Sequence, residues 1–199
     1  MIDIEKYDFS FIALSMQVNL MVKSARTLKD NKKIDVAEIG DGNSKTGKRK
    51  LVDIKKRIKN LTSNELSLLL NGDLITQRQI AFLSICKTHF FIRDFTVEIL
   101  REKLLVYDYQ LTEGDYIIFY RRKSEMHPEM DKLTEKTQNK IRQVTFKILE
   151  QAGIIDDVKS KTIQPQLLEH SVIRTIEEDD KEWLKIFLMS DLDIENLNK

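Results

Sequence analysis

Proline, glycine and histidine are scarce in this 199-residue chain, which has two, six and three of them, and cysteine occurs once. Sheet-rich folds need many turn residues, so this shortage favours helices. The single cysteine, Cys86, cannot form a disulfide within the chain, which suits a reducing compartment. So few histidines and cysteines also leave little material for nucleophilic catalysis or for a metal site.

Long apolar runs are missing too. No stretch approaches the ~20 apolar residues that a membrane-spanning helix needs. The first six residues contain acids where a secretory signal has basic residues. We therefore expect a cytoplasmic protein with no membrane partner. Hydrophobic residues make up 41% of the chain and charged residues 33%, which is typical of a globular protein with a strongly charged surface.

The formal net charge of +1 conceals an uneven distribution of charge along the chain. Residues 1–60 carry 14 basic and 8 acidic side chains, whereas residues 150–199 carry 6 and 12. A basic first part and an acidic last part indicate an anionic partner near the N-terminus, although a random scatter of charge is the alternative.

Apolar residues recur at helical spacing along most of the chain, which predicts a mainly α, compact multi-helix protein. The pattern is also compatible with two helical subdomains. The first, 1–125, contains a basic helix at about 44–60, and the second, 126–199, contains an acidic tail. Helices are predicted over 9–29, 74–88, 91–107, 135–152 and 166–176. Two short apolar pieces around a polar turn predict a small β-hairpin near 154–163, and a helix followed by a hairpin is typical of a winged helix.

The most distinctive segment lies between Lys45 and Lys59, where a single acid, Asp53, occurs among eight basic residues. Like charges one turn apart destabilise a helix, and an ordinary solvated face mixes signs. A phosphate backbone would neutralise such a helix. We therefore predict that this segment contacts nucleic acid with little sequence specificity. The candidate residues are Lys45, Lys48, Arg49, Lys50, Lys55, Lys56, Arg57 and Lys59.

A plain solvated helix is the main alternative for this segment, and binding to anionic lipid is disfavoured because its apolar stripe lacks Trp and Phe. Two smaller basic clusters occur, and we interpret both as surface charge offset by nearby acids. They consist of Arg121, Arg122 and Lys123, and of Lys136, Lys140, Arg142 and Lys147. In a winged helix, Lys159 and Lys161 at the hairpin tip would approach a DNA backbone.

One motif imitates a nucleotide-binding loop. Gly42, Gly47 and Lys48 have the spacing of the phosphate loop, but the next residue is Arg49 instead of the Ser or Thr that holds Mg²⁺. Cys86 and His89 supply two ligands, whereas zinc needs three or four. The sequence therefore predicts no catalytic residue, no cofactor and no metal.

The segment from Phe90 to Lys103, with Arg93-Asp94-Phe95-x-x-Glu98 at its centre, and the later His127-Pro128-Glu129 closely resemble the BrxA family, small components of BREX bacteriophage-defence systems. The resemblance runs from about Phe9 to the region of Asp191. It implies a small, mainly helical, non-enzymatic DNA-binding accessory protein that works with other subunits of the system. It supplies no catalytic motif to transfer.

Two hypotheses follow. The first is a DNA-binding accessory protein that uses residues 45–59, with RNA remaining an alternative ligand because phosphate contacts do not distinguish the two. The second is a scaffold or adaptor that docks other defence subunits through the acidic residues 177–199.

Overall fold

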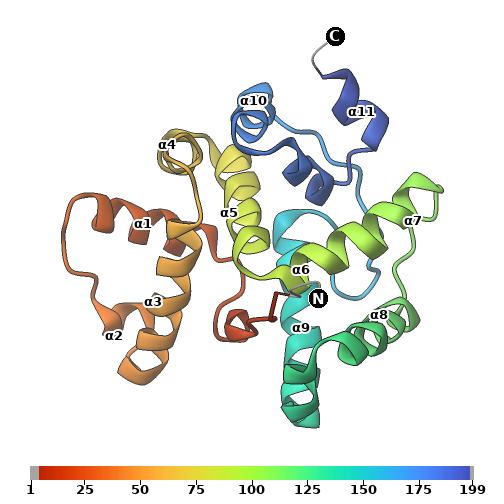
Figure 1. Cartoon of the computed structure of the whole chain (residues 1–199). Coiled ribbons are helices and arrows are strands. Elements are labelled where there is room, and N and C mark those ends of the chain that lie inside the picture. Colours follow the sequence, from red (N-terminus) through yellow and green to blue (C-terminus); the bar gives the residue numbers. More distant parts are fainter. Residues whose placement is uncertain (1–4, 198–199) are drawn as a thin grey trace.

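The structure, a computed structural model, describes residues 5–197 and is mainly helical, as predicted (Figure 1). Within that range eleven α-helices occur with three short 3-10 helices and one π-helical segment, η2. The α-helices are α1 (Val18–Lys29), α2 (Val36–Ile39), α3 (Ser44–Lys59), α4 (Ser63–Asn71), α5 (Leu74–Thr88), α6 (Phe90–Phe95), α7 (Glu102–Leu105), α8 (Glu113–Met126), α9 (Glu135–Ala152), α10 (His170–Asp179) and α11 (Asp191–Asn196). The others are η1 (Ser10–Ala13), η2 (Thr96–Arg101), η3 (Pro128–Lys132) and η4 (Lys181–Phe187).

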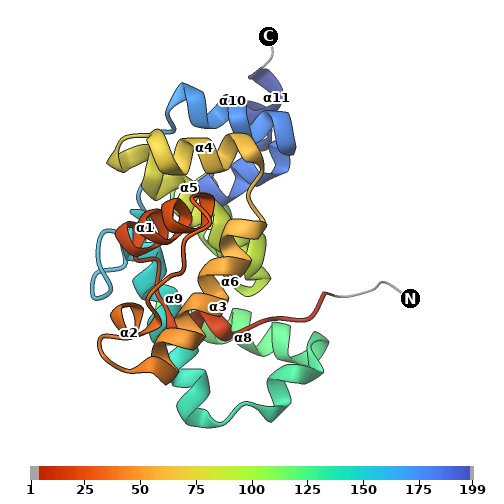
Figure 2. The ribbon, with the colours of Figure 1, turned by 90° about the vertical axis from the view of Figure 1, so that its left-hand side faces the viewer.

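Helix α5 lies at the centre of the fold. It contacts α1, α3, α4, α6, α9 and α10, and every residue from Gln79 to Lys87 is buried. A helix that is apolar on all sides requires neighbours on all sides. Figure 1 shows the other helices arranged around it, and Figure 2 presents face-on the side formed by α1, α2 and α3.

One large hydrophobic cluster has members from Tyr7 to Ile194, and a smaller one consists of Leu14, Ile39 and Ile54. The large cluster contains residues from both predicted subdomains, 1–125 and 126–199. The division of the chain into these two subdomains stays a prediction. No helix within residues 5–197 has both the length and the apolar character needed to cross a bilayer.

The predicted continuous helix over 9–29 is wrong, because the chain is extended at Leu14 and left-handed at Gln17. The break separates η1 from α1. Instead of continuing a helix, the backbone oxygens of Leu14 and Ser15 accept hydrogen bonds from the Arg57 guanidinium, at 2.8 and 3.0 Å. Phe11, Leu14 and Met16 can thus all be buried in a segment that a single helix face would not bury.

The predicted hairpin near 154–163 is also wrong, since the structure forms no strand there. A single isolated bridge joins Ile155 to Ile163, and Thr162 bridges to Gln110 instead of extending a ladder. Two aspartates organise the turn. Asp157 accepts hydrogen bonds from the backbone of Lys159 and Ser160, and Asp156 accepts one from Thr162. These side-chain bonds compete with strand pairing, so the segment is a loop.

A fully buried charged network joins α3 to the junction between α5 and α6. Arg57 Nη2 lies 2.6 Å from Asp53 Oδ2, and His89 Nε2 lies 2.8 Å from Asp53 Oδ1. His89 Nδ1 lies 3.1 Å from the backbone oxygen of Asp8, so both ring nitrogens lie within hydrogen-bonding distance of an oxygen atom. Burial raises the pKa of Asp53, but the hydrogen bond from His89 and the charge of Arg57 outweigh it and hold that pKa below its ordinary value.

Replacing Asp53 tests this network. Asp53→Asn should lower the free energy of unfolding by about 3–5 kcal/mol near pH 7, because it leaves the buried Arg57 guanidinium without its counter-charge. The folded-state pKa of Asp53 is depressed, so its contribution is present above its ordinary pKa of 3.8 and is lost as the pH falls through the lower folded value. In urea unfolding, the free energies of unfolding of wild type and Asp53→Asn should therefore approach each other below pH 3.8.

The control is Asp30→Asn, at an exposed residue outside the network, which should change the free energy of unfolding by no more than about 0.5 kcal/mol. Equal stability of wild type and Asp53→Asn would show that the network is not stabilising.

Candidate nucleic-acid interface

The basic segment forms α3, whose start is fixed by close packing against α2. The Asn43 side chain caps α3 by accepting a hydrogen bond from the Thr46 backbone. Gly47 faces the backbone oxygen of Val36, and a Cβ on Gly47 would lie only 1.8 Å from that oxygen. Glycine is therefore required at the contact. The stretch that imitates a phosphate loop is the corner between two helices, with no strand before it in the described chain.

The eight predicted contact residues divide by exposure. Five side chains are exposed and form no ion pair or hydrogen bond with other residues of the range 5–197: Lys45, Lys48, Arg49, Lys55 and Lys59. We call these five residues the α3 ridge. Lys56 is also exposed, but its Nζ lies 2.6 Å from Asp8. Lys50 is buried, with its Nζ 3.0 Å from Asp41.

Arg57 is the clearest correction, because its side chain is completely buried and cannot meet a ligand. It holds Asp53 on one side and the backbone oxygens of Leu14 and Ser15 on the other. The sequence contained a signal for this role. Asp53 is the one acid of the segment and precedes Arg57 by four residues, the spacing of an ion pair on one helix face.

The exposed cations share one side of α3. At 100° per residue, Lys45, Lys48, Lys55 and Lys59 lie on a single face, with Arg49 beside them. Val52, which is 55% exposed, lies in the middle of that face. Asp53 points to the buried side, so the solvent side of α3 carries cations and no carboxylate.

The acidic last part of the chain does not neutralise α3. Several of its carboxylates pair with cations of other elements, for example Asp179 with Lys87 of α5 at 2.7 Å and Asp191 with Arg101 of η2 at 2.8 Å. Leu184 and Phe187, in the same part of the chain, are buried in the large core. The predicted acidic tail is therefore folded as part of the body, and the positive charge of the ridge remains available.

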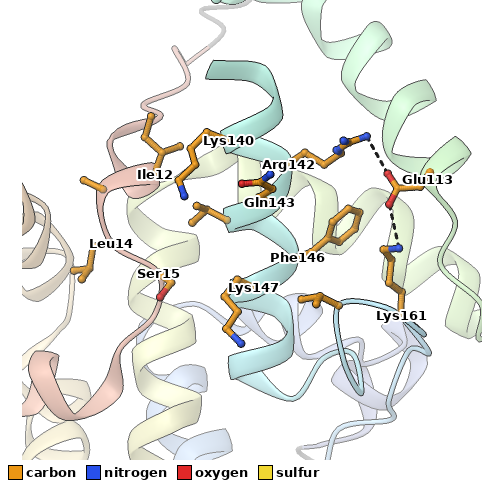
Figure 3. A pocket seen from close by; sticks show the side chains of 13 residues that line it. Ile12, Leu14, Ser15, Glu113, Lys140, Arg142, Gln143, Phe146, Lys147 and Lys161 are labelled. Carbon is orange, nitrogen blue, oxygen red and sulfur yellow. Dashed lines mark hydrogen bonds and ion pairs between the residues drawn. The ribbon is translucent and has the colours of Figure 1, made fainter. Parts of the chain in front are cut away.

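A second basic surface is a cleft of about 590 Å³ over α9, which we call the α9 cleft. Figure 3 shows α9 between two walls, the segment Ile12–Ser15 and the loop that carries Lys161. Four cations and one carboxylate are among its lining residues: Lys140, Arg142, Lys147, Lys161 and Glu113.

The cations of the α9 cleft differ in their partners. Glu113 is shared by Arg142, at 3.2 Å, and Lys161, at 3.0 Å. Lys147 pairs with Glu150, and Lys140 has no ion pair or hydrogen bond within residues 5–197. We interpreted the cations of this helix as offset by nearby acids, and this interpretation holds only in part. Glu113 is shared by two cations, and Lys140 has no acidic partner within residues 5–197.

Three of the side chains considered for catalysis or metal binding lie in the core, whereas His170 is exposed at the start of α10. Cys86 and His89 are both completely buried, and burial raises the pKa of the Cys86 thiol. His127 is buried and stacks on Tyr7 with ring centroids 3.7 Å apart. Within residues 5–197, no group of three or more His, Cys, Asp or Glu side chains is placed to hold a metal ion.

The block that carries the family resemblance has a structural role. Phe91 and Phe95 of α6 are buried in the large core. Asp94 and Glu98 both pair with Lys123 of α8, at 3.1 and 2.5 Å, and so join η2 and α6 to α8. None of these side chains belongs to the α3 ridge or to the α9 cleft.

Comparisons with known proteins agree on one family. The model of the family described as BrxA matches residues 5–180. A curated relative from Bacillus cereus, "BREX protein BrxA", is 29% identical over 107 residues, which is 53% of this chain and 54% of the relative. The match thus spans about half the length of that relative.

A solved structure resembles the fold over nearly its whole length. It is the crystal structure of an uncharacterized protein from Magnetospirillum magneticum, with a TM-score of 0.79 and 15% sequence identity. The similarity covers 93% of this chain and 99% of that one. At this identity it shows a shared fold and nothing about a shared ligand.

The placement of the lysines predicts their chemical reactivity. Brief treatment with an amine-acylating reagent should modify Lys48, Lys55 and Lys59 rapidly, whereas Lys50, buried and paired with Asp41, should react slowly. Peptide mass spectrometry measures each rate. Lys50 should match the others once the protein is unfolded in urea, and equal rates in the folded protein would contradict its buried position.

Proposed function

The chain belongs to the BrxA family, and on this basis we propose that it is a non-catalytic, DNA-binding accessory protein of a BREX phage-defence system. The observation that carries the DNA-binding part is the α3 ridge. Five cations stand exposed on one side of a helix, and no carboxylate of the described chain compensates them. A polyanion supplies the missing counter-charge.

Phosphates suit the ridge for two physical reasons. Each contact between a cation and a phosphate releases condensed counterions, so affinity falls with a slope of about −0.9 per contact when plotted against salt on logarithmic scales. Five contacts would give a slope of about −4.5. In addition, an α-helix of about 10–12 Å diameter fits the major groove of about 12 Å. Since Lys and Arg here meet phosphates, we expect weak dependence on sequence.

The non-catalytic part of the proposal rests on where the reactive side chains lie. Cys86 is completely buried, and His89 is bound to Asp53 and to the Asp8 backbone. His127 is held between Tyr7 and Glu129. Groups committed in this way are not free to accept protons from a substrate or to attack one.

Charge reversal on the ridge tests the proposal. The combined variant Lys48→Glu, Lys55→Glu and Lys59→Glu should abolish most binding to duplex DNA, because it replaces attraction of the phosphates by repulsion. Gel shifts on several unrelated duplexes at two salt concentrations measure the effect. Arg57 is left unchanged, since reversing a buried charge would unfold the protein.

The matched control reverses three exposed lysines elsewhere, Lys6, Lys132 and Lys181, and changes the net charge equally. It should retain most of the affinity. Equal losses in both variants would show that total charge matters and the ridge does not. Duplex RNA of the same sequence distinguishes the alternative ligand, and a clear preference for it would change the proposed ligand to RNA.

A protein-docking role is the second candidate, and a run of exposed apolar residues after α7 favours it. Val106 is 72% exposed and Tyr107 is 80% exposed, with Leu105 and Tyr109 beside them. Tyr107 also has a left-handed backbone, with φ of 60°, which is unfavourable for a side chain of this size. Exposed apolar patches of this kind are common in protein contacts.

Substitution of this run tests docking. Val106→Asp with Tyr107→Asp should sharply reduce co-purification with subunits co-expressed from the same defence system, because charge enters an apolar contact. DNA binding should stay unchanged. The paired control is Leu192→Asp, at an apolar residue that is 70% exposed on α11. Undiminished co-purification of the double variant would reject this surface.

A further inference from the structure

We infer that the α9 cleft is a second contact for DNA, in which Lys140 and Lys147 bind phosphates of one strand of a duplex. The inference rests on the proposed function, because it names a further surface for the same ligand. It assigns to α9 a role that its sequence alone does not indicate.

The solvent face of α9 has the required pattern. Lys136, Lys140, Gln143 and Lys147 follow one another at steps of four, three and four residues and form one line along the helix. All four are exposed, whereas Ile141 and Ile148 are turned away from this line and are completely buried. Figure 3 shows Lys140, Gln143 and Lys147 along α9 between the two walls of the cleft.

Both walls are held in place before any ligand binds. Arg57 donates to the backbone oxygens of Leu14 and Ser15 in one wall. In the other wall, Asp157 accepts hydrogen bonds from the backbone of Lys159 and Ser160. A surface that is already ordered loses less conformational entropy on binding. The same Arg57 lies on α3, so the buried network links the cleft to the helix that carries the α3 ridge.

The chemistry of the lining favours phosphates over unpaired bases. Single-strand binders stack bases on exposed aromatic rings. The one aromatic residue that lines the cleft, Phe146, is 5% exposed, and Lys161 Nζ lies 5.3 Å from its ring centroid. The cleft therefore offers cations and no free stacking platform.

The two lysines are far enough apart to contact separate phosphates. Lys147 follows Lys140 by seven residues, which is about 10.5 Å along the helix axis at 1.5 Å per residue. Each lysine has a flexible four-carbon side chain, so the two ammonium groups can reach different phosphates of one strand. The Lys140 side chain forms no ion pair or hydrogen bond within residues 5–197, so it is available without breaking one of them.

The test is a salt titration of duplex binding with the full chain and the variant Lys140→Ala with Lys147→Ala. The salt slope should become shallower by about 1 for each lysine, and binding should weaken equally on unrelated duplexes. Gln143→Ala, between the two lysines, removes no charge and should leave the slope unchanged. A control with Lys132→Ala and Lys181→Ala, outside the cleft, should keep both slope and affinity.

The outcomes separate the inference from the proposed function. If the cleft variant matches the control while charge reversal on the α3 ridge still abolishes binding, the cleft inference fails and the proposed function stands. If the wild type does not bind duplex DNA at low salt, both fail. Weaker binding with an unaltered slope, a loss confined to single strands, or a lowered unfolding midpoint of the cleft variant would also overturn the inference.

Discussion

The buried contacts among Asp53, Arg57 and His89 are the interactions on which the arrangement of the charged elements depends. Each side chain is completely buried, and each meets a charge or an acceptor from a different segment. The network fixes α3 against η1 and against the junction of α5 with α6. It also removes the one acid of the segment from the surface. The outer face of α3 is cationic because its only carboxylate is needed inside.

Charge is segregated in space as well as along the chain. In the last part of the chain, Asp179 pairs with Lys87, and Asp191 pairs with Arg101 and Lys185, so these carboxylates do not neutralise α3. On α3 and, with Lys140, on α9, cations remain that have no partner in the described part of the chain. Because Arg57 also positions the wall of the α9 cleft, the two basic surfaces share a structural support. Such a distribution suits the polyanionic ligand that we propose for this protein.

The sequence predicts best those helices whose ends are determined by residues close to them in the chain. The helix predicted over 135–152 is confirmed as α9; Thr134 caps its start, and Gly153 ends it with the left-handed φ of 75° that such an end requires. The start of α4 is also local, because Thr62 and Glu65 form a capping box there. The predicted helix over 9–29 and the hairpin near 154–163 failed because distant or side-chain partners, Arg57 and Asp157, satisfy the backbone there.

By itself, the sequence determined that the chain is helical, that it belongs with the BrxA family, and that one helix is strongly basic. Periodicity, caps and composition carry that information locally. Only the tertiary structure decided which cations are available: it buries Arg57 and Lys50, pairs Lys56 with Asp8, and leaves five exposed on α3. It also formed the α9 cleft from distant segments. The physical reason is that burial and ion pairing depend on neighbours in space, which a helical pattern does not specify.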